Sequence, residues 1–348
     1  MTSYSAGKLW GMRRLADGRG HFRMVATDQR PPIMALIRAR IARAATWAEI
    51  GAVKRMLIEA LSEDASAILT DPVWGYPAAA DVLRVDRGLM VTLEDHEYDQ
   101  TRGGRRSRVI AGWKACTIRS LGADAVKLLA WVRPDADAAV MEHQRQFVAE
   151  VGRQCQAADI PFVLELLVYP FGVGGGPEYT TDPDKRPELV LESVRAFTGP
   201  DFGIDLWKLE APLPAALVPD PDGPEAASVQ PLFDRLGRLV PGPWVVLSGG
   251  AEPERFRRIL TYACRAGASG FLAGRSIWAD ALAGYPDQET MTAALKTGAR
   301  AELGVLNEIT ARLAAAWSPP GPARLPDAAG PEFARAYGAR AGKSLPDA

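Results

Sequence analysis

Cysteine and histidine are scarce in this 348-residue sequence, and long apolar runs are absent. The three cysteines, Cys116, Cys155 and Cys264, are far apart and form no CxxC pair, which argues against a disulfide framework and against a structural zinc site. The N-terminus has no apolar signal-peptide core, and no run of about 18 apolar residues occurs, so secretion and membrane spanning both lack support. We therefore expect a cytoplasmic protein with no membrane partner.

An excess of charge of either sign is also lacking. Lysine and arginine total 41, against 42 aspartates and glutamates. The composition therefore does not indicate a nucleic-acid partner, and any recognition of anions must be local. Hydrophobic residues make up 47% of the chain, which is enough for a large core in one barrel or in two ordinary domains.

Short apolar runs alternate with amphipathic segments along most of the chain. Apolar residues recur at about 3.6-residue spacing in the predicted helices 47–63, 135–159, 186–197 and 252–268. The predicted strands are 22–28, 66–71, 88–95, 124–131, 161–169, 205–212, 243–250 and 270–278. This alternation predicts an α/β fold, a (β/α)8 TIM barrel. A doubly wound open sheet is the main alternative, because periodicity alone does not exclude it.

Two Gly- and Pro-rich segments interrupt the alternation, at 171–187 and 211–230. We interpret them as extended loops on the active face of the barrel. The GVGGG run in the first segment has the wrong spacing for a dinucleotide-binding fingerprint and no helix directly after it, so we interpret it as a flexible lid. We assign residues 1–317 to a single barrel domain and residues 318–348 to a Pro/Gly-rich C-terminal tail without a predicted function.

A polar residue lies at or near the end of every predicted strand, where barrel enzymes build their sites. These residues are Asp28, Asp71, Glu94, Lys127, Glu165, Lys208, Ser248 and Arg275. Because side chains alternate along a strand, Lys208 faces inward, whereas Trp207 and Leu209 face the helices. By the same reasoning Lys127 and Glu165 point into the barrel mouth. The alternative is a buried ion network with no catalytic role.

Two inward lysines indicate Schiff-base chemistry. A second cation and partial desolvation lower the pKa of a lysine by disfavouring its ammonium form, so that the amine becomes a nucleophile near neutral pH. A protonated imine is an electron sink that lets the adjacent carbon–carbon bond break. Glu165, with Asp28 as a second candidate, is suited to the accompanying proton transfer. This chemistry needs no metal or cofactor, and with only His21, His96 and His143 present we expect no three-histidine zinc site.

An anion site is predicted after the last two strands. The Ser-Gly-Gly turn of LSGGAEPERF leads into a helix, and LAGRSIW places Gly274 and Arg275 at the end of the eighth strand, where this fold usually binds phosphate. An ordinary tight turn with a surface arginine is the alternative. We interpret His96 as a solvated loop residue, with a place in the lining of the barrel mouth as the alternative. We interpret the basic segment 102–108 as a solvated loop rather than a second cation site.

Seven segments resemble a known family. MVATDQR, AILTDPVWGYPAA, GADAVKLLAW, PFVLELLVY, LWKLEAP, LSGGAEPERFRRIL and LAGRSIW closely resemble the class I tagatose 1,6-bisphosphate aldolases and the related sulfofructose-phosphate aldolases. The resemblance runs over residues 20–285. It implies an aldehyde-lyase in which Lys208 forms the Schiff base, Lys127 is its electrostatic partner and Glu165 is the acid/base.

The same resemblance implies which residues bind the substrate and which reaction occurs. Residues implied in binding are Asp28 and Gln29 at the substrate hydroxyls, and Ser248, Gly249, Gly274 and Arg275 around a phosphate. The implied reaction is retro-aldol cleavage of a ketose phosphate or bisphosphate to dihydroxyacetone phosphate and an aldehyde. For tagatose 1,6-bisphosphate that aldehyde is glyceraldehyde 3-phosphate.

The third predicted strand departs from the family pattern, because LEDHEYDQTRGGRRSR stands in place of a YEKTGYD-like run. The distal end of the substrate therefore stays open between a second phosphate, an uncharged group and a sulfonate, the last as in sulfofructose 1-phosphate, which gives sulfolactaldehyde. A barrel lyase or isomerase without Schiff-base chemistry and a non-catalytic sugar-phosphate sensor are further alternatives. We expect a homo-oligomer, a dimer or a tetramer, although the sequence does not fix this state.

Overall fold

Eight parallel strands form a closed barrel in the computed structural model, which describes residues 4–170, 185–319, 333–334 and 337–338. The strands are Phe22–Ala26 (β1), Ala67–Thr70 (β2), Gly88–Thr92 (β3), Ala125–Trp131 (β6), Phe162–Leu167 (β7), Leu206–Leu209 (β8), Trp244–Val246 (β9) and Gly270–Ala273 (β10). Each pairs with the next in this order, and β10 pairs with β1. The predicted TIM barrel is confirmed, and the open sheet is excluded.

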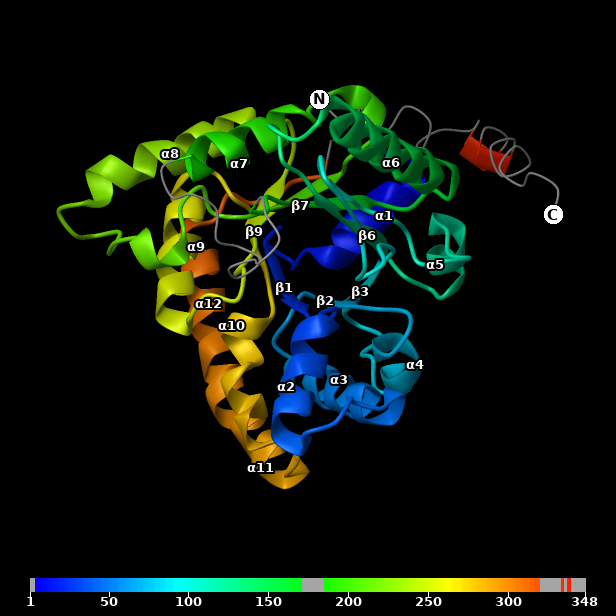
Figure 1. The fold of residues 1–348 in the computed structure, drawn as a ribbon, viewed down its shortest axis with the longest axis vertical. Helices are drawn as coiled ribbons and strands as arrows, with labels where there is room; N and C mark the ends of the chain where they lie inside the picture. The colour runs from blue at the N-terminus through cyan, green and yellow to red at the C-terminus, as the bar shows by residue number, and fades with distance from the viewer. Residues whose placement is uncertain (1–3, 171–184, 320–332, 335–336, 339–348) are drawn as a thin grey trace.

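Helices surround the barrel (Figure 1). The α-helices are Ala6–Leu15 (α1), Pro31–Ile41 (α2), Trp47–Leu61 (α3), Gly75–Ala79 (α4), Ala115–Ser120 (α5), Ala138–Ala157 (α6), Arg186–Arg195 (α7), Ala226–Leu239 (α8), Pro253–Arg265 (α9), Arg275–Trp278 (α10), Gln288–Ala294 (α11) and Arg300–Leu313 (α12). Shorter helical turns are Pro200–Phe202 (η1), Ala215–Leu217 (η2), Asp280–Gly284 (η3) and Leu295–Ala299 (η4). The four helices predicted from periodicity correspond to α3, α6, α7 and α9. Thr46 and Glu49 form a capping box that fixes the start of α3.

Side chains that alternate along the strands belong to different apolar clusters. Leu206 and Val163 belong to the cluster inside the barrel. Trp207 and Leu209 belong to the larger cluster between strands and helices. The predicted inward and outward faces of β8 are therefore confirmed.

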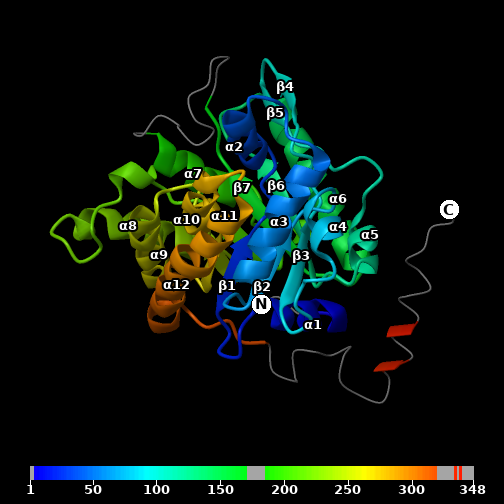
Figure 2. The ribbon, with the colours of Figure 1, turned by 90° about the horizontal axis from the view of Figure 1, so that it is seen from below.

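Helix α1 covers the N-terminal end of the barrel. Its residues Met12 and Leu15 are fully buried in the inner cluster, which also contains Phe22 and Trp317. Figure 2 shows α1 at the opposite end from the hairpin formed by Asp99–Thr101 (β4) and Gly104–Arg106 (β5). Helix α1 therefore closes the end of the barrel that is remote from β4 and β5.

Three predictions of local structure are wrong. The strand predicted at 270–278 ends at Ala273, because Gly274 turns the chain and Arg275 begins α10. The irregular segment predicted at 211–230 already contains η2 and the start of α8 at Ala226. The segment 102–108 is not a solvated loop: it contains the turn and the second strand of the hairpin, and only Arg102 in it is exposed.

Aromatic rings hold that hairpin in place. The guanidinium carbon of Arg105 lies 4.5, 4.7 and 4.8 Å from the ring centroids of Tyr98, Trp131 and Tyr169. Such cation–π contacts are stronger when they are shielded from water. A charge pattern alone does not reveal them, which is why the segment looked solvated.

No helix in the described ranges is long and apolar enough to cross a membrane. The predicted lid at 171–187 lies almost entirely outside the described residues, as does most of the predicted tail at 318–348.

Candidate active site

Two lysines and one glutamate from adjacent strands meet at the C-terminal end of the barrel. The Oε2 atom of Glu165 on β7 lies 2.8 Å from the Nζ atom of Lys127 on β6 and 2.9 Å from that of Lys208 on β8. Glu165 and Lys208 are directly opposite each other in the register of β7 and β8. All three side chains are buried, so this ion cluster is only weakly screened by solvent.

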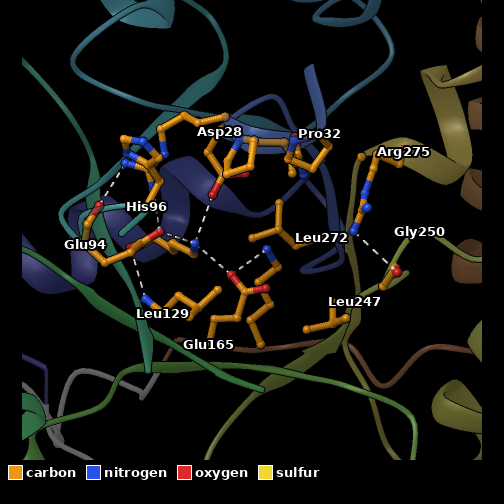
Figure 3. Close-up of a pocket in the computed structure, with 18 of the residues that line it drawn as sticks. Asp28, Pro32, Glu94, His96, Leu129, Glu165, Leu247, Gly250, Leu272 and Arg275 are labelled. Atoms are coloured by element: carbon orange, nitrogen blue, oxygen red, sulfur yellow. Dashed lines mark hydrogen bonds and ion pairs between the residues drawn. The ribbon is translucent and has the colours of Figure 1, made fainter. Parts of the chain in front are cut away.

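Lys127 is the centre of the cluster. Its ammonium also contacts Asp28 at 2.9 Å and Glu94 at 2.7 Å. Figure 3 shows Asp28, Glu94 and Glu165 converging on this ammonium, with Arg275 further away across the pocket. The second oxygen of Glu94 accepts a hydrogen bond from the backbone N–H of Leu129. One cation therefore orients three carboxylates.

These contacts shift pKa values in opposite directions. Burial alone would lower the pKa of Lys127, but the carboxylates of Asp28, Glu165 and Glu94 outweigh burial and raise this pKa well above its ordinary value. Burial would raise the pKa of Asp28, but the charges of Lys127 and Lys208 hold it below its ordinary value. At neutral pH Lys127 is therefore positive and Asp28 negative.

A further buried lysine, Lys54, supports the end of β1 from outside the barrel. Lys54 on α3 donates hydrogen bonds to the carbonyl oxygens of Thr27, at 2.5 Å, and Gln29, at 2.8 Å. It also forms a 2.7 Å ion pair with Asp71, and both of these side chains are completely buried. The two carbonyls flank Asp28, so Lys54 fixes the backbone that presents Asp28 to the pocket.

The opposite wall of the pocket is built from backbone turns after β9 and β10. Gly249 and Gly250 both have positive φ, at 59° and 81°, a conformation that favours glycine. A Cβ atom on Gly250 would lie 2.9 Å from the Cζ atom of Arg275, and one on Gly274 would lie 2.6 Å from the amide nitrogen of Gln29. The glycines therefore let Arg275 and Gln29 lie against the backbone. Arg275 donates a 3.4 Å hydrogen bond to the carbonyl of Gly249.

All of the predicted site residues line one pocket: Lys208, Glu165, Lys127, Asp28, Gln29, Ser248, Gly249, Gly274 and Arg275. His96 lines this pocket too, which agrees with the second of the two interpretations that the sequence leaves open for it. Of the other polar residues at the predicted strand ends, Glu94 also lines this pocket and Asp71 does not. Sequence reasoning did not select Arg30 or Gly250, which line it too, or Lys54 beneath it. Lys54 could have been found as a lysine on the apolar face of a predicted helix. Among the described residues, no group of three or more His, Cys, Asp or Glu is arranged to hold a metal ion.

A closed (β/α)8 barrel with titratable side chains gathered at the C-terminal ends of its strands is the architecture of a TIM-barrel enzyme. The family model for DeoC/LacD family aldolases matches residues 24–280. The chain belongs to this family and is an aldolase, a carbon–carbon lyase.

Named relatives agree with this membership over most of the chain. The tagatose 1,6-diphosphate aldolase 1 of Streptococcus mutans is 31% identical over 88% of this chain and 96% of its own. The tagatose 1,6-diphosphate aldolase 2 of Enterococcus faecalis is 30% identical over 91% of this chain and 97% of its own. The resemblance to tagatose-bisphosphate aldolases is thereby confirmed.

Solved structures show the same fold at lower identity. The fructose-bisphosphate aldolase of Plasmodium falciparum superimposes with a TM-score of 0.67 at 13% identity, over 90% of this chain and 97% of that one. A Schiff-base-forming fructose-1,6-bisphosphate aldolase gives a TM-score of 0.51 at 16% identity, over 83% of this chain and 99% of that one.

Proposed function

We propose that this protein is a metal-independent class I aldolase that reversibly cleaves a ketose phosphate or bisphosphate, such as tagatose 1,6-bisphosphate, to dihydroxyacetone phosphate and an aldehyde. The observation that carries the proposal is the shared contact of Lys127 and Lys208 with one oxygen of Glu165. In this arrangement an amine and a fixed positive charge each lie within hydrogen-bonding distance of the same proton acceptor.

The reaction begins at Lys208. Its neutral amine adds to the ketone carbon of the substrate, and uptake of a proton with loss of water gives a protonated imine. The hydroxyl on the carbon beyond the bond to be cleaved then loses its proton to Glu165. The carbon–carbon bond breaks, its electron pair moves into an enamine, and the aldehyde leaves. Protonation of the enamine carbon and hydrolysis of the imine release dihydroxyacetone phosphate and regenerate the amine.

Lys127 acts on this reaction without bonding to the substrate. Three carboxylates keep it protonated, so it places a fixed positive charge on the same glutamate oxygen that Lys208 contacts. It also holds Glu165 and Asp28 in fixed positions at the rim of the barrel.

The two ends of the pocket suit different parts of the substrate. We assign the phosphate of the dihydroxyacetone half to Ser248, Gly249, Gly274 and Arg275. Substrate hydroxyls would meet Asp28 and Gln29, because the Oδ1 atom of Asp28 and the side-chain oxygen of Gln29 are buried without hydrogen-bond partners in the described part of the chain. Such acceptors are costly to leave unpaired, and a bound hydroxyl would satisfy them.

We further propose that the enzyme works as a cytoplasmic homo-oligomer, and light scattering of the purified protein tests its oligomeric state.

Borohydride reduction in the presence of dihydroxyacetone phosphate tests the chemistry. Peptide mass spectrometry should find one reduced adduct per chain, on Lys208, and Lys208→Ala should lose both the adduct and nearly all turnover. Cleavage should continue in EDTA. Turnover without an adduct would instead support a barrel lyase that uses no imine, and binding of the sugar phosphate without turnover would support a sensor.

A further inference from the structure

The end of the pocket remote from Arg275 carries an uncommitted polar atom. Figure 3 shows His96 and Arg275 on opposite sides of the pocket, with Glu165 between them. If the phosphate of the dihydroxyacetone half binds near Arg275 and the ketone carbon bonds to Lys208, the aldehyde half extends toward His96. This inference therefore rests on the proposed function.

The imidazole of His96 is oriented by its neighbours. Its Nδ1 atom lies 3.1 Å from a carboxylate oxygen of Asp95. Asp95 is itself fixed by the backbone N–H of Glu97 at 3.2 Å and by the guanidinium of Arg108 at 3.3 Å. The ring also packs edge-on against Trp74, with centroids 5.9 Å apart. An ionised carboxylate beside Nδ1 selects the tautomer with its proton there, which leaves a lone pair on Nε2.

Other polar groups at this end are already paired. Arg30 donates to the backbone carbonyl of Glu94 at 2.9 Å and to its carboxylate at 3.3 Å. The two oxygens of that carboxylate are occupied by Lys127 and by the N–H of Leu129. The Nε2 atom of His96 has no hydrogen-bond partner within the described ranges, and 27% of the side-chain surface is exposed. It is therefore free to bind a ligand.

We propose that His96 is a specificity-determining residue that accepts, through Nε2, a hydrogen bond from a hydroxyl group on the aldehyde half of the substrate. The lone pair matches a donor such as a hydroxyl and does not match a dianionic phosphate. Together with Asp28 and Gln29, it gives the pocket a third acceptor for hydroxyl groups. Asp95 is a positioning residue, because it acts only by holding the ring.

The charges around His96 make this recognition pH-dependent. Burial and the positive charge of Arg30 lower the pKa of His96, whereas Asp95 and Glu97 partly oppose this shift. Arg108 faces the same group through Asp95. The ring is therefore neutral at neutral pH. Below its pKa, Nε2 gains a proton and becomes a donor, so the acceptor for the hydroxyl is lost.

Condensation of dihydroxyacetone phosphate with two uncharged aldehydes tests the proposal. Glyceraldehyde and propanal have the same carbon skeleton and differ only in hydroxyl groups, and neither titrates between pH 5 and pH 8. The readout is the ratio of their kcat/KM values. We expect the natural protein to prefer glyceraldehyde and His96→Leu to lower this ratio about tenfold, the scale of one lost hydrogen bond.

Two controls separate recognition from folding. His96→Gln should keep part of the preference, because its amide oxygen reaches about as far as Nε2. In the natural protein the ratio should also fall at acid pH, whereas in His96→Gln it should not. An unchanged ratio in His96→Leu, or an equal loss with both aldehydes, would overturn the role of His96. Failure to consume either aldehyde in the natural protein would instead count against the proposed aldolase.

Discussion

The Nζ atom of Lys208 lies 2.9 Å from the Oε2 atom of Glu165, and both groups are buried. The same oxygen also contacts Lys127 at 2.8 Å. A proton that leaves Lys208 therefore has an acceptor in direct contact. The residue that bonds to the substrate and the residue that moves the proton are different, so substitution can separate their effects.

Glu165→Gln should uncouple imine formation from cleavage. The amide fills the same space but does not take up a proton, so we expect the reduced adduct on Lys208 to persist while kcat falls about 100-fold or more, the usual scale for a general acid/base. Mass spectrometry of the trapped protein and steady-state kinetics measure the two effects. Glu210→Gln is the matched control, because Glu210 is a buried glutamate that pairs with Arg186 and lies outside the pocket lining. Full turnover in Glu165→Gln would contradict the assignment.

Lys127→Met should destabilise the protein, and the loss should depend on pH. It removes the shared partner of Asp28, Glu94 and Glu165, and breaking a buried ion pair costs about 3–5 kcal/mol. In the natural protein the pKa of Asp28 is lowered, so its ionised form stabilises the fold above the ordinary pKa of about 3.9 and this stabilisation is lost below it.

In Lys127→Met the contribution of Asp28 to stability should depend on pH in the opposite direction. Without Lys127, burial raises the pKa of Asp28, and the folded state then binds a proton at a pH where the unfolded chain does not. Its stability should therefore increase as the pH falls from 7 to 5. Chemical denaturation at both pH values measures this change, with Lys127→Arg as the charge-preserving control. Equal destabilisation at both pH values would show that burial of the carboxylates is not the cause.

The faces of the strands could be predicted because side-chain alternation has a fixed period. Lys127, Glu165 and Lys208 were placed inside the barrel by that rule alone, and their meeting follows once three adjacent parallel strands are aligned. The predictions failed where the chain leaves the strand. Arg275 was expected at a strand end but begins a helix after the turn at Gly274.

Contacts between distant segments lie beyond sequence reasoning for a different reason. Lys54 and Gln29 are 25 residues apart and on different elements, and their hydrogen bond exists only because α3 packs against the end of β1. His96 looked solvated because its pairing with Asp95 and its place in the pocket depend on how the third loop folds back. Neither relation has a fixed spacing that a single sequence can reveal.

Gly250→Ala should weaken binding of dihydroxyacetone phosphate. The new Cβ would lie 2.9 Å from the Cζ atom of Arg275, so the guanidinium has to move. We expect the KM for dihydroxyacetone phosphate to rise about tenfold, the scale of one lost charge-assisted hydrogen bond. Positive φ should also cost about 1–2 kcal/mol of stability. Gly267→Ala is the matched control, because Gly267 has φ of 92° but open space around its Cβ position, so it should lose stability without a change in KM.

Lys54→Met should slow catalysis although Lys54 never touches the substrate. The substitution leaves the buried carboxylate of Asp71 without its cation and frees the carbonyls of Thr27 and Gln29. We expect a loss of about 3–5 kcal/mol in stability, as for other broken buried ion pairs. Asp28 lies between the two freed carbonyls, so kcat should also fall, by about tenfold at a temperature where the variant is folded. Thermal unfolding and steady-state kinetics measure the two effects.

Lys8→Met is the control for Lys54→Met. It also removes a buried cation, but it leaves the carbonyls that flank Asp28 supported. Lys8 on α1 forms a 2.7 Å ion pair with Asp205 and a 3.3 Å hydrogen bond to the carbonyl of Gly203, so its environment resembles that of Lys54. Helix α1 lies at the end of the barrel opposite to β4 and β5, and Lys8 is not among the residues that line the pocket. We expect Lys8→Met to lose comparable stability and to keep its kcat. If both variants kept kcat, the carbonyls flanking Asp28 would need no fixed support, and the role of Lys54 would be confined to stability.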